Sequence, residues 1–459
     1  MPKKSYDVII VGGGPGGLNL GALLTHAGKK VLVLERGGKE SLGGRAVSGT
    51  VDGAAVDNGI KGLIMVGSQD EVYRRIGKQM PENVCEWTNS GELYLDGKWH
   101  KLDDIIKRSF EEFIRVYKRG AIDMTYEEVE ALDDISIEKY VTDMTDDKDV
   151  INFFRYLGWL FGGTRPVPTD YSAGSLFYSI KKQVEANKQM PTLSYWPKGG
   201  SGAVATGLIE AINEKGGEIR TNANVSRVVI EEGRVKGVEV EEGERVVPLQ
   251  LLDTRFIEAP VVVSAVSIWD FLGIVSEDDL PPWYVERIKF LQHQTLNLGT
   301  VTYAMDDEEA WDHSGQRWVQ QGPVSGRPWI GSSLRYTGKK SRYQVSFWLQ
   351  TGWWEKPNFW ELHKASHKAA LKKLFQDWEA DIEKLFPKVV KNALWLVRSF
   401  GPAAIMETPG NVGSKLVDIE AEGVEGLYLV GDRTSVAKVT GVYGTAMAAL
   451  AACDLILKK

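Results

Sequence analysis

The sequence predicts an α/β protein in which a discontinuous, Rossmann-like dinucleotide-binding domain carries an inserted α+β domain of mixed sheet and helices. Two observations predict this class. A strand, a glycine loop, a helix and a second strand follow one another within residues 6–36, and strand and helix patterns of the same kind return near residue 192 and after residue 425. Strands that alternate with helices are typical of a parallel sheet. The residues between these segments are then insertions.

The opening segment has the pattern of a strand–helix–strand unit. Val8–Val11 and Val31–Leu34 are unbroken apolar runs, which are typical of strands buried on both faces of a parallel sheet. Residues 18–27 between them have the composition of an apolar helix. The first strand runs directly into the sequence GGGPGG, so the chain turns sharply from strand to helix at this point.

Glycines in this turn match the G-x-G-x-x-G spacing at Gly12, Gly14 and Gly17. In that pattern the glycines allow the tight turn, the close approach of the backbone to a pyrophosphate and close packing of helix on strand. The helix N-terminus offers free N–H groups to the phosphates. Glu35 ends the second strand, where its carboxylate can accept hydrogen bonds from both ribose hydroxyls. The pattern predicts a dinucleotide site, and the alternative is a glycine-rich turn in an ordinary α/β fold.

Composition narrows the classes of partner. A chain of 459 residues predicts two or three domains, and 43% hydrophobic with 25% charged residues is typical of a globular protein. The net charge of −7 gives no indication of a nucleic-acid partner. Cys85 and Cys453 lack metal-type spacing, so we predict neither a metal site nor a disulfide framework. We expect a cytoplasmic protein, and the aromatic-rich segment 151–161 keeps peripheral membrane contact open as an alternative.

The two insertions are expected to form one substrate domain. The dinucleotide-binding domain is expected at residues 1–85, 192–268 and 415–459, and the substrate domain at 86–191 and 269–414. Strands are expected at 296–305, 329–336, 343–350 and 393–399, with a long helix at 359–386. The chain holds 15 Trp, 16 Tyr and 14 Phe, most of which we expect to be ordinary core or surface residues. The alternative is a substrate cavity lined by aromatic side chains.

The closing segment predicts a second contact with the cofactor. A buried strand ends in Gly431 and Asp432, and the aspartate suits a hydrogen bond to a polyol hydroxyl. A glycine-containing loop with Gly441 and Val442 then leads into a final apolar helix at 445–457, whose positive N-terminal end points toward the loop.

Together, five segments resemble the flavin amine oxidase and phytoene desaturase superfamily of FAD-dependent oxidoreductases. They are GGGPGG with Glu35-Arg36, LGGRA with DNG, PKGGSGA, NVSRVVIEEGRVKGVEV, and GLYLVGD with TGVYGTAMAALAA. The resemblance extends from residue 7 into the last helix and is nearest to the branch of phytoene desaturases, carotenoid isomerases and retinol saturases. It implies that the dinucleotide is FAD.

The resemblance also implies residue roles. The FAD-binding residues at matching positions are Gly12, Gly14, Gly17, Glu35, Arg36, Gly44, Arg45, Val225, Gly431, Asp432, Gly441 and Val442. In this family the backbone at Val225 contacts adenine, and Asp432 bonds the ribityl chain or the pyrophosphate. Gly441 and Val442 bring N–H groups and the helix dipole to the flavin, and this positive field favours the anionic reduced flavin.

Two departures from the amine oxidase pattern concern the reacting centre. Amine oxidases carry the strand motif G-[ST]-V-x-K, whose lysine holds a water near flavin N5, whereas the chain reads GTVTY and places Tyr303 at that step. The paired-tyrosine cage is not clearly matched, although Tyr443 lies near one of its positions. Lys61 follows the DNG loop, which in the family that the chain resembles lies beside the flavin ring. Lys61, Tyr303 and Tyr443 are the candidate catalytic residues, and a structural role is the alternative for each.

The resemblance implies hydride transfer between flavin N5 and carbon, which forms or reduces a C=C bond in an apolar, alicyclic or aromatic small molecule. The alternatives are an amine oxidase that releases imine and hydrogen peroxide, a non-redox isomerase that uses reduced flavin, and a non-catalytic FAD-binding scaffold. Oxygen, a quinone or another protein can accept the electrons. A second dinucleotide unit is not found in the sequence, so we do not predict bound NAD(P)H.

Overall fold

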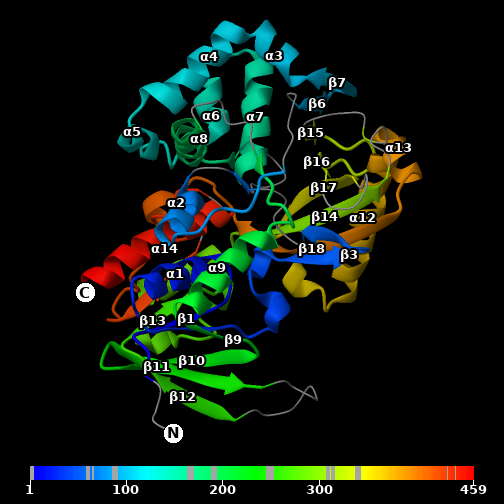
Figure 1. Ribbon diagram of the computed structural model, residues 1–459. Helices are drawn as coiled ribbons and strands as arrows, with labels where there is room; N and C mark the ends of the chain where they lie inside the picture. The colour runs from blue at the N-terminus through cyan, green and yellow to red at the C-terminus, as the bar shows by residue number, and fades with distance from the viewer. Residues whose placement is uncertain are drawn as a thin grey trace.

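The computed structural model describes residues 5–57, 63–64, 67–84, 91–162, 170–187, 194–243, 253–306, 311, 316–335, 343–431, 433–439 and 441–459. Lys61 and Asp432, named above as site residues, lie outside this set. The chain is arranged around a parallel sheet with a small antiparallel sheet below it, a larger mixed sheet beside it and a group of helices above (Figure 1).

The parallel sheet has five strands in the order β19-β13-β1-β2-β9. These strands are Leu427–Leu429, Val261–Ser264, Val8–Val11, Val31–Leu34 and Glu218–Arg220. All neighbouring pairs run parallel. One sheet therefore joins segments from three distant parts of the sequence, as expected for a discontinuous domain.

Both faces of this sheet are covered. Ile10 and Val33 pack against the helices α1, α9 and α14, which span Pro15–His26, Gly202–Glu214 and Gly441–Lys458. Ile9 and Leu32 point to the opposite face, as alternation along a strand requires. That face packs against a three-stranded antiparallel sheet of β10 (Ala223–Glu231), β11 (Arg234–Glu242) and β12 (Thr254–Glu258). The prediction of doubly buried strands is confirmed, whereas β12 was not predicted.

The second large sheet has seven strands in the order β18-β14-β17-β16-β15-β6-β7. Their bounds are Trp395–Ile405, Thr295–Met305, Tyr343–Gly352, Trp329–Arg335, Gln316–Val319, Glu92–Leu95 and Lys98–Lys101. The pairing is antiparallel except between β6 and β15. Strands from both insertions therefore share one sheet.

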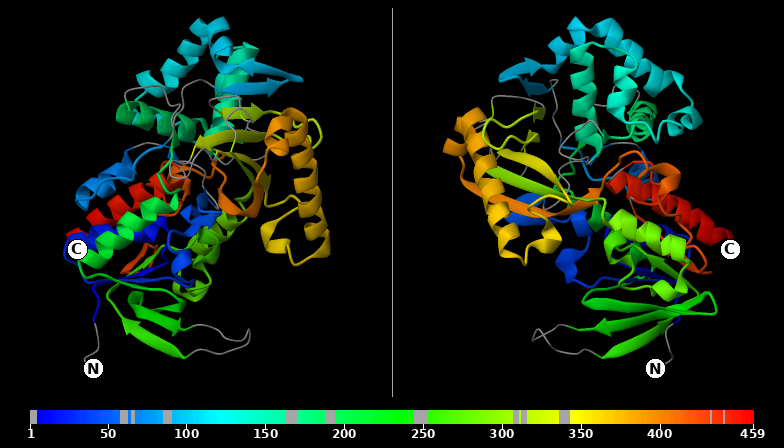
Figure 2. Two further views of the ribbon diagram at one scale, coloured as in Figure 1. Left: turned by 45° about the vertical axis from the view of Figure 1, so that its right-hand side comes forward. Right: turned by 180° about the vertical axis from the view of Figure 1, so that it is seen from behind.

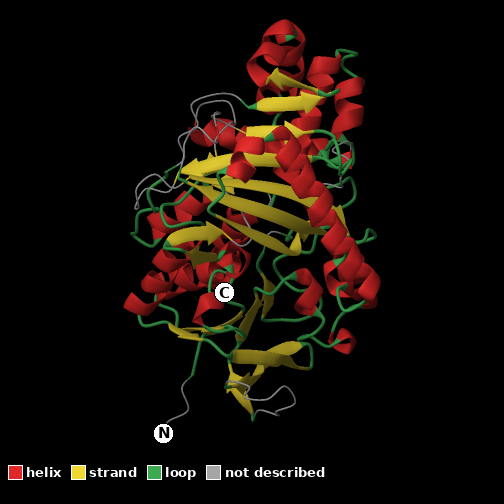
Figure 3. Cartoon of the chain, turned by 90° about the vertical axis from the view of Figure 1, so that its right-hand side faces the viewer, coloured by secondary structure: helices red, strands yellow, loops and turns green. Residues whose placement is uncertain are grey.

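Helices cover both faces of the seven-stranded sheet. The long helix α12 (Ala365–Leu385) and the short α13 (Pro387–Lys391) lie across one face, which Figure 3 shows from that side. A group of helices packs against Trp318 and Ile330 on the other face and stands at the end of the molecule opposite the small antiparallel sheet (Figure 2). These helices are α3 (Leu102–Arg108), α4 (Phe110–Lys118), α5 (Tyr126–Glu130), α6 (Ile137–Thr142), α7 (Lys148–Gly162) and α8 (Ala173–Asn187).

The remaining elements are short. They are the hairpin β3 (Ser48–Val51) and β4 (Ala54–Asp57), the pair β5 (Leu63–Ile64) and β8 (Ser194–Tyr195), and the helices α2 (Ser68–Arg75), α10 (Ile268–Phe271) and α11 (Pro282–Gln292). Among the described residues, α14 is the helix whose length and composition would suit a membrane span, and it packs against α1 in the core. The predicted class, an α/β fold with an inserted mixed sheet, is confirmed.

Candidate cofactor site

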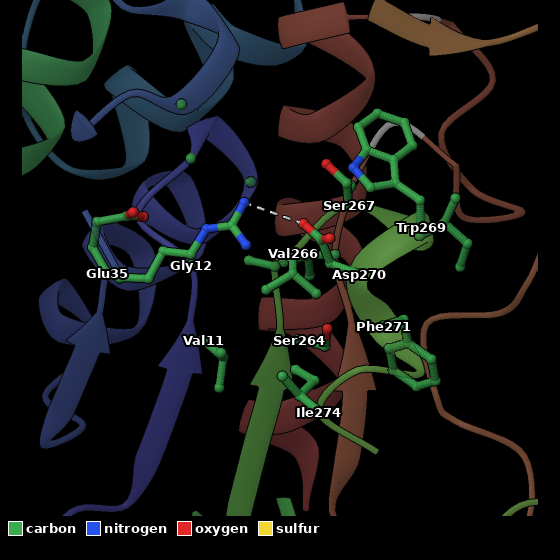
Figure 4. Close-up of a pocket in the computed structure, with 18 of the residues that line it drawn as sticks. Val11, Gly12, Glu35, Ser264, Val266, Ser267, Trp269, Asp270, Phe271 and Ile274 are labelled. Atoms are coloured by element: carbon green, nitrogen blue, oxygen red, sulfur yellow. Dashed lines mark hydrogen bonds and ion pairs between the residues drawn. The ribbon is translucent and has the colours of Figure 1, made fainter. Parts of the chain in front are cut away.

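The main cavity lies at the carboxyl ends of β1, β2, β13 and β19, where ligands bind in open parallel sheets. Its volume of about 1010 Å³ is at the upper end of the roughly 300–1,000 Å³ of small-molecule pockets, which suits a dinucleotide larger than a drug-sized ligand. Figure 4 shows part of its wall, built from residues at and beyond the carboxyl ends of β1, β2 and β13.

The glycine loop is shaped for close contact with a ligand. Gly12 has φ +110°, a conformation that favours glycine, and a Cβ there would lie 3.0 Å from the carbonyl oxygen of Ala265. A Cβ at Gly17 would overlap the carbonyl oxygen of Gly12, so this glycine is required for packing. A Cβ at Gly14 would meet no atom within 4 Å, and Gly14 lines the cavity. The loop therefore leaves open a space at Gly14 that a phosphate can approach.

The Glu35 carboxylate is held in place by backbone N–H groups. Gly13 donates to Oε2 at 2.8 Å, and Gly37 donates to Oε1 at 2.9 Å. A carboxylate has about four acceptor positions, so these two bonds leave one on each oxygen for a ribose hydroxyl. Glu35 lines the cavity, as its predicted role requires.

A buried hydroxyl gives an independent test of whether a polar ligand fits. Ser264 ends β13 and lines the cavity, and its side chain is almost fully buried. Its Oγ has no hydrogen-bond partner among the described residues. Because leaving a buried polar atom unpaired costs about 1–3 kcal/mol, a ligand with hydroxyl or phosphate oxygens is the natural partner for this group.

Three arginines, Arg36, Arg45 and Arg433, lie at the wall of the cavity. The Arg36 guanidinium lies 3.4 Å from the Asp270 carboxylate and spans from the end of β2 to α10 (Figure 4). The Arg45 guanidinium lies 5.1 Å from the centre of the Trp269 ring and donates to the carbonyl of Ala403. Arg45 therefore links the loop after β2 to strand β18 of the other sheet.

Most of the predicted FAD-binding residues meet at this cavity. Those that line it are Gly12, Gly14, Glu35, Arg36, Gly44, Arg45, Val225 and Gly431. Gly17, Gly441 and Val442 are not part of the lining. Helix α14 reaches the cavity through Thr445, the fifth residue of the helix, instead.

Tyr303 lies away from the cavity. Val301, Tyr303 and Met305 alternate onto the face of β14 that α12 covers, and the Tyr303 ring contacts Phe347 edge to face. The residue is only 3% exposed, and burial, reinforced by the charge of Glu379, raises its pKa to about 12. Strand alternation thus gives Tyr303 the position of a core residue, which argues against the catalytic role predicted for it.

Tyr443 also lies in the core. Its ring belongs to the apolar cluster that packs α14 against α2 and β8, together with Tyr73 and Tyr195. The hydroxyl is buried without a hydrogen-bond partner among the described residues, and burial raises the pKa of Tyr443 well above its ordinary value. The Tyr443 side chain therefore faces the neighbouring elements of the core, whereas Thr445 lines the cavity.

The lining residues that were not predicted from sequence include Trp269, Asp270 and Arg433. Trp269 and Asp270 follow β13 directly, and a polar residue after a central parallel strand was the available signal. Arg433 lies two residues beyond Gly431, in the segment that the sequence predicts to contact the cofactor, and this closeness was the available signal.

Comparison with known proteins agrees with this geometry. The family described as flavin containing amine oxidoreductase matches residues 15–457. The chain belongs to this family. It is therefore an FAD-dependent oxidoreductase, and the cavity fits the cofactor in its size, its glycine loop and its polar wall. The resemblance found in the sequence is confirmed.

Two curated members of the wider group illustrate the similarity. The chain is 24% identical over 269 residues to a 4,4'-diapophytoene desaturase from Methylomonas sp, covering 52% of this chain and 52% of that protein. It is 23% identical over 344 residues to an all-trans-retinol 13,14-reductase from Danio rerio, covering 64% of this chain and 53% of that protein. The chain thus spans about half the length of the curated relatives it matches.

Solved structures share the fold of this flavoenzyme. An oxidoreductase from Methanosarcina mazei superposes with a TM-score of 0.71 at 17% identity, covering 98% of this chain and 100% of that chain. A double mutant of putrescine oxidase superposes with a TM-score of 0.68 at 15% identity, covering 100% of both chains. At these identities the superpositions show the fold alone.

Proposed function

We propose that this flavoenzyme transfers a hydride between its flavin and a carbon atom, forming or reducing a C=C bond in an apolar or alicyclic small molecule. FAD supplies the hydride acceptor or donor when it is bound. The substrate would be held by the inserted domain, residues 86–191 and 269–414, which stands against the cofactor cavity through Pro402 and Ile405 of β18.

The observation that carries this proposal is the packing of Tyr303. Amine oxidases of the family place a lysine at this step of the strand, and this chain has a tyrosine whose ring lies in the core under α12. An aromatic ring in that core does not hold a water beside the flavin. The curated relatives matched over half of the chain or more are named as phytoene or diapophytoene desaturases, retinol 13,14-reductases and a prolycopene isomerase, and all of these names describe changes at C=C bonds.

The charges around the cavity support hydride transfer to the flavin. Arg45 and Arg433 bring positive charge to its wall. Three carboxylates also line it: Glu35 accepts hydrogen bonds from backbone N–H groups, Asp270 pairs with Arg36, and Glu40 is the third. Positive groups favour the anionic reduced flavin and thereby the acceptance of a hydride.

The test is anaerobic reduction of the purified holoenzyme with three substrate classes: amines, saturated carbonyl compounds, and polyenes. We expect saturated carbonyl or partly saturated polyene compounds to bleach the visible flavin band, or polyenes to reoxidise the photoreduced enzyme. Bleaching by amines alone, with hydrogen peroxide formed in air, would refute the proposal in favour of amine oxidation. Double-bond movement that needs reduced flavin but no net electron transfer would favour the isomerase.

The electron acceptor is tested in the same preparation. Once a reductant has bleached the flavin, oxygen, a soluble quinone and a one-electron protein acceptor are added separately. The acceptor that restores the visible band fastest at equal concentration is the physiological class. Rapid reoxidation by oxygen would identify an oxidase, and slow reoxidation by oxygen with fast reoxidation by quinone would identify a dehydrogenase.

A further inference from the structure

A buried ion pair stands directly behind the cofactor cavity. The carboxylate of Glu407 accepts a hydrogen bond from Arg433 Nη1 at 3.1 Å, and the side chains are 2% and 7% exposed. Its other oxygen accepts from the hydroxyls of Tyr171 and Ser175, each at 2.6 Å. Burial, with Glu407 beside it, raises the pKa of Tyr171 well above its ordinary value, so this hydroxyl keeps its proton and stays a donor.

This cluster joins three parts of the chain. Arg433 follows β19 of the parallel sheet, Glu407 follows β18 of the seven-stranded sheet, and Tyr171 and Ser175 come from the start of α8. The backbone adds a further link, since Ser172 N–H donates to the carbonyl of Glu407 at 2.8 Å. The position of Arg433 is therefore set jointly by both sheets and by a helix of the first insertion.

Arg433 is in contact with the cofactor cavity, and Glu407 is not. Arg433 lines the main cavity, between Gly431 and Thr434, and it also lines a small space behind the wall. Glu407, Ser175 and Lys438 line that small space but not the main cavity. The positive member of the pair thus stands between the cavity and its own counter-ion.

We propose that Arg433 is a cation of the FAD site and that Glu407, with Tyr171 and Ser175, is the positioning residue that holds it there. FAD offers two anionic groups to such a cation, its pyrophosphate and the reduced flavin. The alternative is an ion pair that only fastens α8 and β18 to the cofactor domain. The proposal concerns the cofactor alone and does not depend on the substrate.

A cofactor-binding role and a purely structural role of this ion pair predict different signs for the effects of the Glu407 and Arg433 variants on the cofactor. Glu407→Gln removes the negative charge of the carboxylate that pairs with Arg433, which strengthens the attraction of Arg433 for an anionic group. Arg433→Gln does the opposite, because it leaves a carboxylate beside the cavity. A purely structural pair loses stability in both variants, and any effect on the cofactor then has the same sign in both.

The experiment measures FAD and riboflavin affinity of the apoprotein by flavin fluorescence, and the two-electron potential of the holoenzyme by anaerobic titration against a redox dye. If the charge acts on the pyrophosphate, we expect Arg433→Gln to weaken FAD roughly tenfold and Glu407→Gln to tighten it, with riboflavin affinity unchanged. If it acts on reduced flavin, we expect opposite shifts in potential, about 30 mV for each tenfold change in the equilibrium constant.

Controls keep the result interpretable if a single variant folds poorly. The double variant E407Q/R433Q keeps a neutral hydrogen-bonding pair, and relative to E407Q it should lose FAD affinity or potential. Glu92→Gln and Arg317→Gln break another buried pair, between β6 and β15 and away from the cavity, and should lower only the melting temperature. The proposal would be overturned if FAD affinity and potential shifted with the same sign in E407Q and R433Q. It would also be overturned if neither quantity changed in R433Q or in the double variant.

Discussion

The guanidinium of Arg36 lies 3.4 Å from the carboxylate of Asp270, and this pair bridges the cofactor cavity from the end of β2 to the start of α10 (Figure 4). The two side chains are 71% and 37% exposed, so the bridge contributes little to folding, less than about 1 kcal/mol. Its position at the wall of the cavity suggests a kinetic effect on the release of the cofactor instead.

We predict that Asp270→Asn accelerates FAD release several-fold while leaving the melting temperature of the apoprotein unchanged. Loss of the bridge removes an interaction that must open before the cofactor can leave. Release is measured by flavin fluorescence after dilution into an FAD-capturing apoprotein. Asp377→Asn, which breaks an exposed pair with Lys373 on α12, is the matched control. Equal release rates in D270N and D377N would show that the bridge does not restrain FAD.

The glycine loop allows two substitutions of identical chemistry to be compared. Gly17→Ala places a methyl group against the Gly12 carbonyl and should destabilise the protein by about 1–3 kcal/mol, as overpacking does. Gly14→Ala meets no neighbouring atom, so it should fold normally and lose FAD affinity because its methyl group enters the cavity. Thermal melts of both apoproteins and FAD titrations separate the outcomes. If the G14A protein bound FAD as tightly as the parent, the phosphates would not bind next to Gly14.

Glu35→Gln should weaken FAD by roughly one to two powers of ten, since hydrogen bonds to a charged group are worth about 1.5–3 kcal/mol each. The amide keeps a single oxygen for the two N–H groups of Gly13 and Gly37 and presents an NH₂ group to one of them. The measurement is a fluorescence titration of apoprotein with FAD and, in parallel, with riboflavin. An equal loss for riboflavin, which lacks the adenosine, would contradict the assignment of Glu35 to the ribose.

Asp133 predicts a dependence of stability on pH. Burial raises its pKa from 3.8 to about 6, Lys438 opposes this shift, and Glu130, Asp134 and Glu407 add to it. Because the folded state holds the proton more tightly than the unfolded state, this residue stabilises the fold below about pH 4, and the contribution is lost as pH rises through about 6.

We therefore expect Asp133→Asn to flatten the change in denaturation midpoint between about pH 4 and pH 6 and to be the more stable protein at pH 7. The effect is reduced by solvent screening, because the carboxyl is only partly buried. Asp134→Asn, at the neighbouring exposed position, is the control. If the denaturation midpoint of D133N changed with pH as much as that of the parent, a group other than Asp133 would cause the pH dependence.

Tyr443→Phe and Tyr303→Phe should retain turnover within about twofold. Neither hydroxyl lines the cavity, and removal of the unpaired Tyr443 hydroxyl should leave stability unchanged or slightly increased. Turnover with the substrate class identified above and the melting temperature are measured together. Loss of a general acid or base lowers turnover by about a hundredfold or more. A loss of that size in either variant would show that the substituted tyrosine is catalytic.

What could be predicted from the sequence was local in the chain. The glycine loop, β1, β2 and Glu35 lie within one short segment, and each is specified by its neighbours. The direction of Tyr303 could not be predicted, because it depends on which face of β14 α12 covers, and that helix is placed by distant contacts. The ion pair of Glu407 and Arg433 depends on Tyr171 as well, and no spacing along the chain brings the three together.

Segment 101–119 shows a different limit. The helical spacing of Ile106, Phe110, Phe113 and Tyr117 predicts a single amphipathic helix there, but the structure breaks it at Ser109, where the backbone leaves the helical region between α3 and α4. Ser109 hydrogen-bonds Asp147, a residue near the start of α7, so a partner distant in sequence decides the break. Periodicity indicates which residues face the core and cannot show where tertiary contacts bend the axis.

The order of strands in the parallel sheet constrains how the protein is made. β19 and α14, which complete one edge of the sheet and one wall of the cavity, are synthesised after every other strand of that sheet and after both insertions. Domains usually fold as their residues emerge from the ribosome. Here the edge of β13 that pairs with β19 stays uncovered until residues 427–458 are made, so the sheet and the cavity wall are completed only by this last segment.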